Sequence, residues 1–318
     1  MPKSPSRTVS PSDPLRYRKL PLFFGGLTVL AFSGYSAYLY ASLQRGISDA
    51  ANIDVPADVS SRYDVIAPSF DASVNCTENL IGLTRLRKKM AQEASGDVCE
   101  VSIGTGRNLK YYDWDFKGLN GVGKVGNDYK IKRGKVRSFT AVDKSGEMLG
   151  IAHEKFSKEY PGVTGVQWVL QDASVPLPPP PQSGGEKTGN AGKKYDTIVQ
   201  TMGLCSTSDP VKLLKNLGES VKEVDGRILL LEHGRGTWNW LNYILDGLAP
   251  RHALEFGCLW NKDIGEIVNE SGLEVVKIER KHLGTTWWIE LRPRKKDPVE
   301  TEVPSNEDGD KSRGKAHD

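Results

Sequence analysis

The stretch "DVCEVSIGTGRNLKYY", from Asp97 to Tyr112, decides the fold of this chain. It runs from an apolar strand into a tight turn with glycines at 104 and 106, and then towards a helix. Glycine is needed in such a turn where φ is positive or where a ligand comes close to the backbone. A strand, a glycine turn and a helix in this order are typical of the first unit of a doubly wound α/β sheet, with a ligand bound at the turn.

The turn lacks the residues that bind phosphates. A dinucleotide-binding turn has a third glycine or alanine where Leu109 stands, so that helix and strand pack closely under a pyrophosphate. The chain also has no Gly-Lys-Ser/Thr sequence, which excludes the phosphate loop of nucleoside triphosphatases. The turn therefore suits a ligand that has an adenosine and no phosphate, and S-adenosylmethionine is such a ligand.

Two later strands end in carboxylates that fit the rest of this cofactor. The segment "VRSFTAVDKS" ends as a strand at Asp143, where a carboxylate can accept from both ribose hydroxyls. The segment "VTGVQWVLQDAS" ends at Asp172, where a carboxylate can accept from the adenine amino group. Each acid alone is explained equally well as a helix cap. Three signals in the correct order on successive strands favour the cofactor.

Strand-like and helix-like segments alternate from residue 51 to about residue 294, which predicts a doubly wound α/β sheet. The helix "DPVKLLKNLGESVK" is expected to begin with Asp209 as N-cap and Pro210 at its first position. The short loop "HLG", between Lys281 and Thr285, predicts that the last two strands form an antiparallel hairpin.

An apolar segment precedes this domain. "PLFFGGLTVLAFSGYSAYLYASL", residues 21–43, contains no charged residue and is long enough to cross a bilayer as a helix. A buried core helix would normally show a polar face, and a cleaved secretory signal would be shorter. We therefore expect a transmembrane helix at 21–43, a globular domain at 51–295 and a disordered polar tail at 296–318.

Residues 1–20 form a basic flank that is rich in serine and contains one acid, which is typical of a mitochondrial presequence. Because the positive flank is amino-terminal, the positive-inside rule places the globular domain on the opposite side of the membrane. For the mitochondrial inner membrane, that side is the intermembrane space.

Two insertions interrupt the domain. Residues 117–137 carry seven basic residues and one acid, which fits a solvated insertion or a contact with lipid headgroups. Residues 176–194 contain prolines followed by glycines, which predicts a disordered surface loop.

The composition excludes some classes of function. The net charge of +3 is too small to indicate a nucleic-acid partner. The four cysteines have neither a CxxC pair nor metal-ligand spacing, so we expect no structural disulfide and no metal site. These cysteines are Cys76, Cys99, Cys205 and Cys258.

Several longer segments carry a family resemblance. "YDVIAPSFDASVNCTENLIGLTRLRKKM", "GDVCEVSIGTGRNLKYY", "SFTAVDKSGEML", "YDTIVQTMGLCSTSDPVKLL" and "RILLLEHGRGTWNWLNYILDGLAPRHALEFGCLWNKDI" resemble the mitochondrial inner-membrane methyltransferase-like family of fungi. They are similar, more distantly, to the membrane-anchored thiol methyltransferase-like proteins of animals. The resemblance covers about residues 63–293. It implies a class I S-adenosylmethionine-dependent methyltransferase with a seven-stranded sheet whose last strand is antiparallel.

The same resemblance implies a set of cofactor-binding residues. At the methionine end these are Glu100, Ser102, Gly104, Thr105, Gly106 and Asn108. Around the ribose, the adenine and the fourth-strand rim they are Asp143, Lys144, Asp172, Ala173, Met202, Gly203 and Leu204.

The methyl acceptor is less defined. A thiolate or stabilised carbanion needs little help from a side chain, whereas a hydroxyl or amine usually needs a base. The candidate bases are His233, just after the fifth strand, and His252, in the helical region that follows. For His233, a helix cap or a hydrogen-bonded structural histidine is the favoured explanation. "TWNWLNYILDGL" contains Trp238, Trp240, Tyr243 and Leu245, which fit either the floor of an apolar acceptor pocket or a helix packed on the sheet. With a membrane anchor nearby, a lipophilic small-molecule acceptor is the favoured hypothesis.

Two other classes of function compete with this hypothesis. A membrane-tethered assembly or binding factor would keep the fold without turnover, but the glycine turn and both strand-end acids are present. A nicotinamide oxidoreductase is disfavoured because Leu109 occupies the position of the third glycine.

Overall fold

The structure is a computed structural model that describes residues 19–56, 58–116, 119, 133–181 and 192–294. Several predicted regions lie outside the described residues. These are the basic segment before residue 19, most of the insertion at 117–137, the centre of the loop at 176–194 and the tail after residue 294.

A seven-stranded sheet forms the centre of the domain, in the order β3-β2-β1-β4-β5-β7-β6. Five strands pair in parallel, whereas β7 is antiparallel to both β5 and β6. The predicted sheet with an antiparallel last strand and a final hairpin is therefore confirmed. The strands are β1 (Gly96–Val101), β2 (Val136–Asp143), β3 (Val166–Leu170), β4 (Thr197–Thr201), β5 (Arg227–His233), β6 (Glu274–Lys281) and β7 (Thr286–Arg292).

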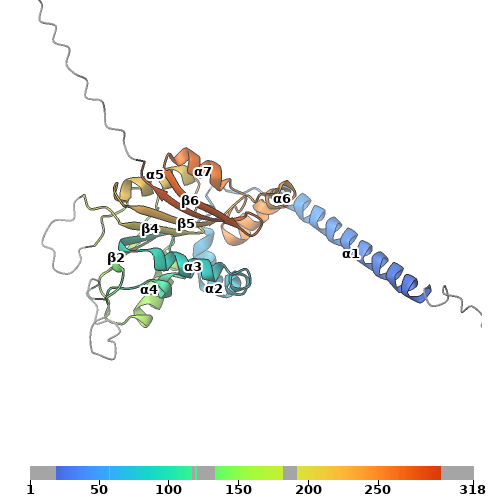
Figure 1. Cartoon of the computed structure of the whole chain (residues 1–318), viewed down its shortest axis with the longest axis horizontal. Coiled ribbons are helices and arrows are strands. Elements are labelled where there is room, and N and C mark those ends of the chain that lie inside the picture. Colours follow the sequence, from blue (N-terminus) through green and yellow to red (C-terminus); the bar gives the residue numbers. More distant parts are fainter. Residues whose placement is uncertain (1–18, 57, 117–118, 120–132, 182–191, 295–318) are drawn as a thin grey trace, which may run out of the picture.

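Helices cover both faces of this sheet (Figure 1). Within α5, Asp209 caps the helix by accepting from Lys212 N at 2.9 Å, and Pro210 stands in the first turn, as predicted. The helices of the domain are α2 (Arg62–Leu80), α3 (Leu83–Glu93), α4 (Gly146–Glu159), α5 (Pro210–Ser220), α6 (Asn239–Phe256) and α7 (Ile264–Ser271).

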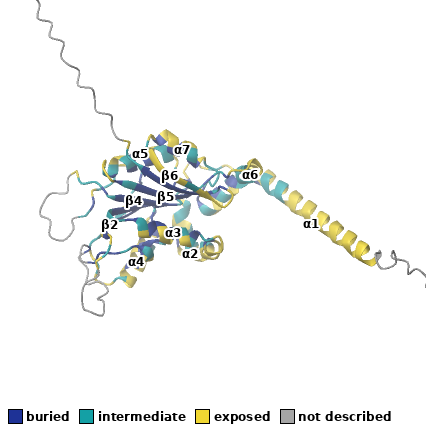
Figure 2. Ribbon diagram, in the orientation of Figure 1, coloured by how far each residue is buried: buried dark blue, intermediate teal, exposed yellow. Residues whose placement is uncertain are grey.

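The strands are buried on both faces because their apolar side chains alternate between two cores. In β5, Leu229 and Leu231 belong to the core that includes residues of α3 and α4, while Ile228 and Leu230 belong to the core that includes residues of α5 and α7. Figure 2 shows the central strands as the most buried part of the molecule. This rigid layer fixes the positions at which the strands end.

The helix predicted after the glycine turn is only one turn of 3₁₀ helix, η1 (Leu109–Tyr111). The chain then becomes extended, and Trp114 bridges to Val136 at the start of β2. The Trp114 ring is fully buried, and its Nε1 donates to Leu109 O at 3.1 Å. Burial of this large ring ends the helix early, so this part of the prediction is wrong.

The apolar segment forms one long helix, α1 (Lys19–Ala51), which projects away from the domain in Figure 1. It is the one helix among the described residues that is long and apolar enough to cross a membrane. It extends beyond the predicted residue 43 because its last turns pack on α6, where Tyr243 Oη donates to Gln44 Oε1 at 3.1 Å.

Candidate functional site

A pocket of about 990 Å³, including the space at its open mouth, lies at the carboxyl ends of β1, β2, β3 and β4. Ligands bind at this edge in doubly wound sheets because the strand order reverses there. Nine of the predicted cofactor residues line the pocket. They are Ser102, Gly104, Thr105, Asp143, Lys144, Asp172, Ala173, Met202 and Gly203.

The backbone at the pocket edge is strained at two matching positions. Ser102 directly follows β1 with φ of 51°, and Met202 directly follows the neighbouring β4 with φ of 56°. Residues other than glycine rarely adopt this left-handed conformation, which costs about 1–3 kcal/mol and is frequent at functional sites. Both residues turn the chain sharply at the ends of adjacent parallel strands.

The two glycines of the turn serve different purposes. A Cβ on Gly106 would lie 2.4 Å from Leu109 Cδ1, so Gly106 allows the apolar side chain of Leu109 to pack beneath the turn. A Cβ on Gly104 would meet no described atom within 4 Å, and Gly104 lines the pocket. Both have positive φ, at 57° for Gly104 and 74° for Gly106. Gly104 therefore leaves room for a ligand next to the backbone.

Asp143 connects the glycine turn to the next helix. Its Oδ2 accepts from Gly104 N at 2.7 Å, and its Oδ1 accepts from Ser145 N at 2.9 Å. Burial raises the pKa of this carboxyl above its ordinary value. Each carboxylate oxygen can accept more than one hydrogen bond, so Asp143 retains the capacity to accept from a ribose hydroxyl.

Lys144 and Asp172 lie together in the pocket lining. Lys144 Nζ lies 2.5 Å from Asp58 Oδ2 and 3.5 Å from Asp172 Oδ2. The hydrogen bond from Lys144 lowers the pKa of Asp58 to about 2. Asp58 precedes α2 in the chain, so these ion pairs connect that segment to the loops after β2 and β3.

Four predicted cofactor residues lie outside the described lining of the pocket: Glu100, Gly106, Asn108 and Leu204. Glu100 is buried and accepts from Asn108 Nδ2 at 2.7 Å and from Tyr112 Oη at 2.8 Å. Burial raises the pKa of Glu100 to about 7. These contacts show that Glu100 and Asn108 brace the turn from behind, while Leu204 is a core residue.

Neither predicted base reaches the pocket in the part of the chain that the structure describes. His233 Nε2 lies 2.7 Å from Cys258 Sγ, at the end of β5. The ring of His252 stacks on Trp260 with centroids 3.9 Å apart, and burial lowers the pKa of His252 to about 4. The structural explanation of both histidines fits these contacts better than catalysis.

The aromatic residues of α6 do not form a pocket floor. Trp238, Trp240 and Tyr243 are 57%, 57% and 52% exposed, and none of them belongs to the described pocket lining. The hypothesis of an acceptor site built on these rings is therefore wrong. Their exposure beside α1 calls for a different explanation.

Helix α2 supplies pocket residues that sequence reasoning missed. Tyr63 and Phe70 line the pocket, and their ring centroids are 6.1 Å apart. Tyr63 Oη lies 2.8 Å from Ser206 Oγ, which also lines the pocket. Burial raises the pKa of Tyr63 well above its ordinary value, so the phenol stays protonated. The seven-residue spacing, which places both rings on one helix face, was the available signal.

The same helix carries three acids that are also seven residues apart, Asp64, Asp71 and Glu78. Each of them contacts at least one residue that lines the pocket. Asp64 Oδ1 accepts from Ser145 Oγ at 2.5 Å, at the start of α4, and Asp71 Oδ1 accepts from Thr105 Oγ1 at 2.6 Å in the turn. These contacts hold α2 over the pocket.

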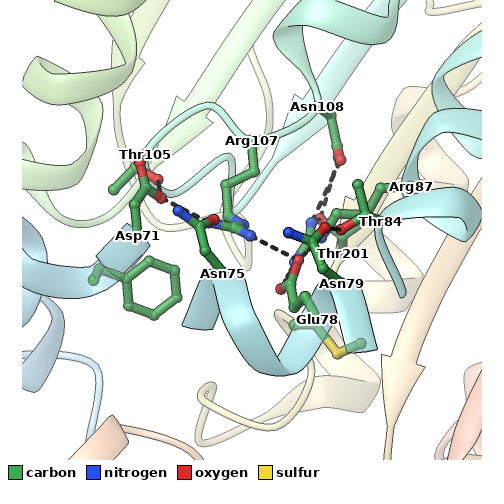
Figure 3. A network of polar contacts seen from close by, with 12 residues as sticks. Asp71, Asn75, Glu78, Asn79, Thr84, Arg87, Thr105, Arg107, Asn108 and Thr201 are labelled. Carbon is green, nitrogen blue, oxygen red and sulfur yellow. Dashed lines mark hydrogen bonds and ion pairs between the residues drawn. The ribbon is translucent and has the colours of Figure 1, made fainter. Parts of the chain in front are cut away.

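Glu78 is the most buried of the three acids. Figure 3 shows its contacts with Arg87 and Arg107. Its two oxygens accept from Arg87 Nε and Nη2 at 3.0 Å each, and Oε2 also accepts from Arg107 Nη2 at 2.8 Å. Arg87 Nη1 then donates to Thr201 Oγ1 at 2.7 Å, at the end of β4. One network therefore joins α2, α3, the glycine turn and β4. Both arginines line the pocket.

Comparisons with known proteins agree with this architecture. A family profile described as "Methyltransferase domain" matches residues 78–278. The mitochondrial methyltransferase OMS1 of Saccharomyces cerevisiae is 40% identical over 234 residues, which are 73% of this chain and 45% of that protein. The chain thus spans less than half the length of this relative.

Solved structures with a similar arrangement include an O-methyltransferase, NcsB1, from neocarzinostatin biosynthesis, in complex with S-adenosylmethionine. It is 19% identical, with 73% of this chain and 58% of that chain covered and a TM-score of 0.47. Another is a SAM dependent methyltransferase from Aquifex aeolicus, 18% identical, with 72% and 97% of the two chains covered and a TM-score of 0.44. The resemblance to a mitochondrial methyltransferase family of fungi is confirmed by the yeast relative. Because the family profile matches well over half of the residues, this chain belongs to the methyltransferase-domain family.

Proposed function

We propose that the chain is an S-adenosylmethionine-dependent methyltransferase, anchored by α1 in the mitochondrial inner membrane, that acts on a small lipophilic acceptor. The observation that carries this proposal is the pocket at the ends of β1 to β4, where Asp143 faces a glycine turn without phosphate-binding features.

The residues present fit this cofactor. Gly104 leaves open space beside the backbone, and Asp143 has spare acceptor capacity for a ribose. Asp172, next to Lys144, would accept from the adenine amino group. When bound, the cofactor supplies a methyl group on a positively charged sulfur.

The chain's own contribution is to position the acceptor and exclude water. Methyl transfer is an in-line displacement, so alignment of the two reactants and removal of water from the nucleophile supply most of the catalysis. Tyr63 and Phe70 of α2 add two aromatic rings to the pocket lining, and Ser206 contacts Tyr63. No histidine lines the pocket among residues 19–294 as far as the structure describes them. This favours an acceptor that ionises without a side-chain base, such as a thiol or a carbon acid.

The packing of α1 on α6 supports a membrane anchor. Gln44 contacts Tyr243, and Ile47 lies beside Gly247, so the two helices run in the same direction. One turn before these contacts, α6 carries Trp240 and α1 carries Tyr40, and both side chains are exposed. Exposed tyrosines and tryptophans at one level beside an apolar helix are typical of a membrane–water interface.

The localisation is proposed on three further observations. The yeast relative is named mitochondrial, and the segment at 1–20 has the composition of a presequence. The basic flank lies on the amino-terminal side of α1, which favours a domain in the intermembrane space.

The test uses the full chain in detergent micelles. Calorimetric titration should show binding of S-adenosylmethionine and none of NAD. Asp143→Asn should weaken binding by about tenfold or more, or about 1.4 kcal/mol. Asp225→Asn makes the same chemical change in the exposed turn before β5, at the opposite edge of the sheet from the pocket, and should bind like the wild type. Absence of binding to the wild type would refute the proposed cofactor.

Methyl transfer is tested separately, by incubating the chain with methyl-labelled S-adenosylmethionine and a mitochondrial lipid extract. Label in the organic phase supports a lipophilic acceptor. Cofactor binding without label in any fraction would instead support a non-catalytic membrane-tethered factor.

A further inference from the structure

Three side chains of metal-ligand type converge next to the pocket, although they are far apart in the sequence. Cys205 lies in the loop after β4, His233 ends β5, and Cys258 follows α6. One ligand atom from each lies within 4.8 Å of the others. The distance from His233 Nε2 to Cys258 Sγ is 2.7 Å. Sequence spacing predicted no metal site, because only the packing of these strand and helix ends in the folded domain brings the three residues together.

We propose that Cys205, His233 and Cys258 bind a zinc ion. Two thiolates and an imidazole are a donor set that zinc prefers over harder cations such as magnesium or calcium. In tetrahedral zinc sites such ligand atoms lie about 3.5–3.8 Å apart, as follows from metal–ligand distances of about 2.0–2.3 Å. Small side-chain rotations bring the three atoms to these separations. A water molecule would take the fourth position.

Binding changes the charge of this region in a balanced way. Each thiol releases its proton to solvent when its sulfur binds the metal, and the two thiolates neutralise the dication. Both cysteines are buried, at 1% exposure for Cys205 and 4% for Cys258. A neutral site of this kind can be buried without an uncompensated charge, which would be costly.

The backbone around Cys205 is held in place by the buried Glu232 and the half-buried Lys262. Glu232 accepts from Gly203 N and Leu204 N at 3.1 Å each. Lys262 Nζ donates to Leu204 O at 3.0 Å and also to the carbonyl of Thr207. Such outer contacts orient the ligands of metal sites and improve their affinity.

A further contact joins the two cysteine loops. Leu259 N donates to Cys205 O at 3.1 Å, so the backbone next to Cys258 is bonded directly to Cys205. A disulfide between the two cysteines would use both sulfurs and leave the facing ring nitrogen of His233 without a partner. A metal ion engages all three groups.

The experiment uses the reduced full chain in detergent, stripped of metal with a chelator and titrated with Co²⁺. A thiolate-to-cobalt band and the visible bands of tetrahedral cobalt should appear and saturate at one ion per chain. Zn²⁺ should then displace the cobalt. Cys205→Ser and Cys258→Ser should weaken binding by more than about tenfold, since even changes outside the ligand shell cost 10–100-fold.

Cys99→Ser is the matched control, because Cys99 is equally buried and lies outside the cluster. It should bind cobalt like the wild type. Far-ultraviolet circular dichroism reports whether each variant is folded.

A second measurement needs no variant. X-ray absorption of the zinc-loaded wild type should show two sulfur ligands at about 2.3 Å, with nitrogen or oxygen for the rest. Absence of a saturable cobalt band overturns the proposal. So does an unchanged band in both serine variants, or a Cys205–Cys258 disulfide that persists in the purified wild type under reductant.

Discussion

Replacing Glu78 by glutamine tests whether the polar network that joins α2, α3, the glycine turn and β4 holds α2 over the pocket. The carboxylate is the shared partner of Arg87 and Arg107, and the three side chains are 10%, 7% and 13% exposed. Removing one partner of a buried ion pair costs about 3–5 kcal/mol, because the other charge stays buried without compensation. Glutamine keeps the volume of the side chain and one acceptor oxygen, so we expect the free energy of unfolding to fall by about 3 kcal/mol, at the lower end of this range.

For a domain of this size, a loss of about 3 kcal/mol lowers the melting temperature by roughly 6–12 °C. The assay is thermal unfolding of the full chain in detergent, followed by near-ultraviolet circular dichroism. Glu154→Gln is the control, because Glu154 pairs with Lys158 across one helical turn at 2.5 Å but is 64% exposed. Exposed ion pairs contribute little to folding stability, so the control should have the same melting temperature as the wild type.

Equal melting temperatures for Glu78→Gln and Glu154→Gln would refute the reasoning about burial. A lower melting temperature with unchanged affinity for S-adenosylmethionine would refute the link between this network and the pocket, since Arg107 belongs to the turn and lines the pocket.

Two further predictions concern Glu100 and Trp240. Burial raises the pKa of Glu100 from 4.5 to about 7, so the folded chain binds this proton more tightly than the unfolded chain. The resulting stabilisation is complete below pH 4.5 and is lost as the pH rises to about 7, a change of about 3 kcal/mol. In denaturant titrations, Glu100→Gln should remove this part of the pH dependence of the free energy of unfolding. If that free energy changed with pH between 4.5 and 7 in the variant as it does in the wild type, the prediction would be contradicted. For Trp240, brominated lipid should quench the tryptophan fluorescence of the full chain in vesicles. Trp240→Phe should reduce this quenching and Trp168→Phe, on β3, should not; equal quenching in both variants would rule out the proposed interface.

The cofactor side of the site could be predicted from the sequence because its signals are local. The glycine turn follows a strand directly, and Asp143 and Asp172 stand at or just after the ends of two more strands. Parallel strands bring such ends to one edge of a sheet, so order along the chain is enough to place these residues. The helix cap at Asp209 and the final hairpin are local for the same reason.

Other features depended on packing. Burial of the Trp114 ring shortened the helix after the turn, and no pattern within the turn indicates this. Whether Glu100 lines the pocket or supports the turn depends on where the chain after the turn places Asn108 and Tyr112, which both donate to its carboxylate. His252 resembles a candidate base until its ring is seen stacked on Trp260.

By itself, the sequence determined the α/β sheet, the apolar helix and the ligand edge, because helical and strand periodicity, caps and turns depend on near neighbours. Only the tertiary structure decided that Glu78 would meet both Arg87 and Arg107, and that Cys205 and Cys258 would meet beside His233. These groups are separated by 9 to 53 residues, and the crossovers between strands set their distances. Contacts of that kind follow from the folded order of the strands, which no local pattern encodes.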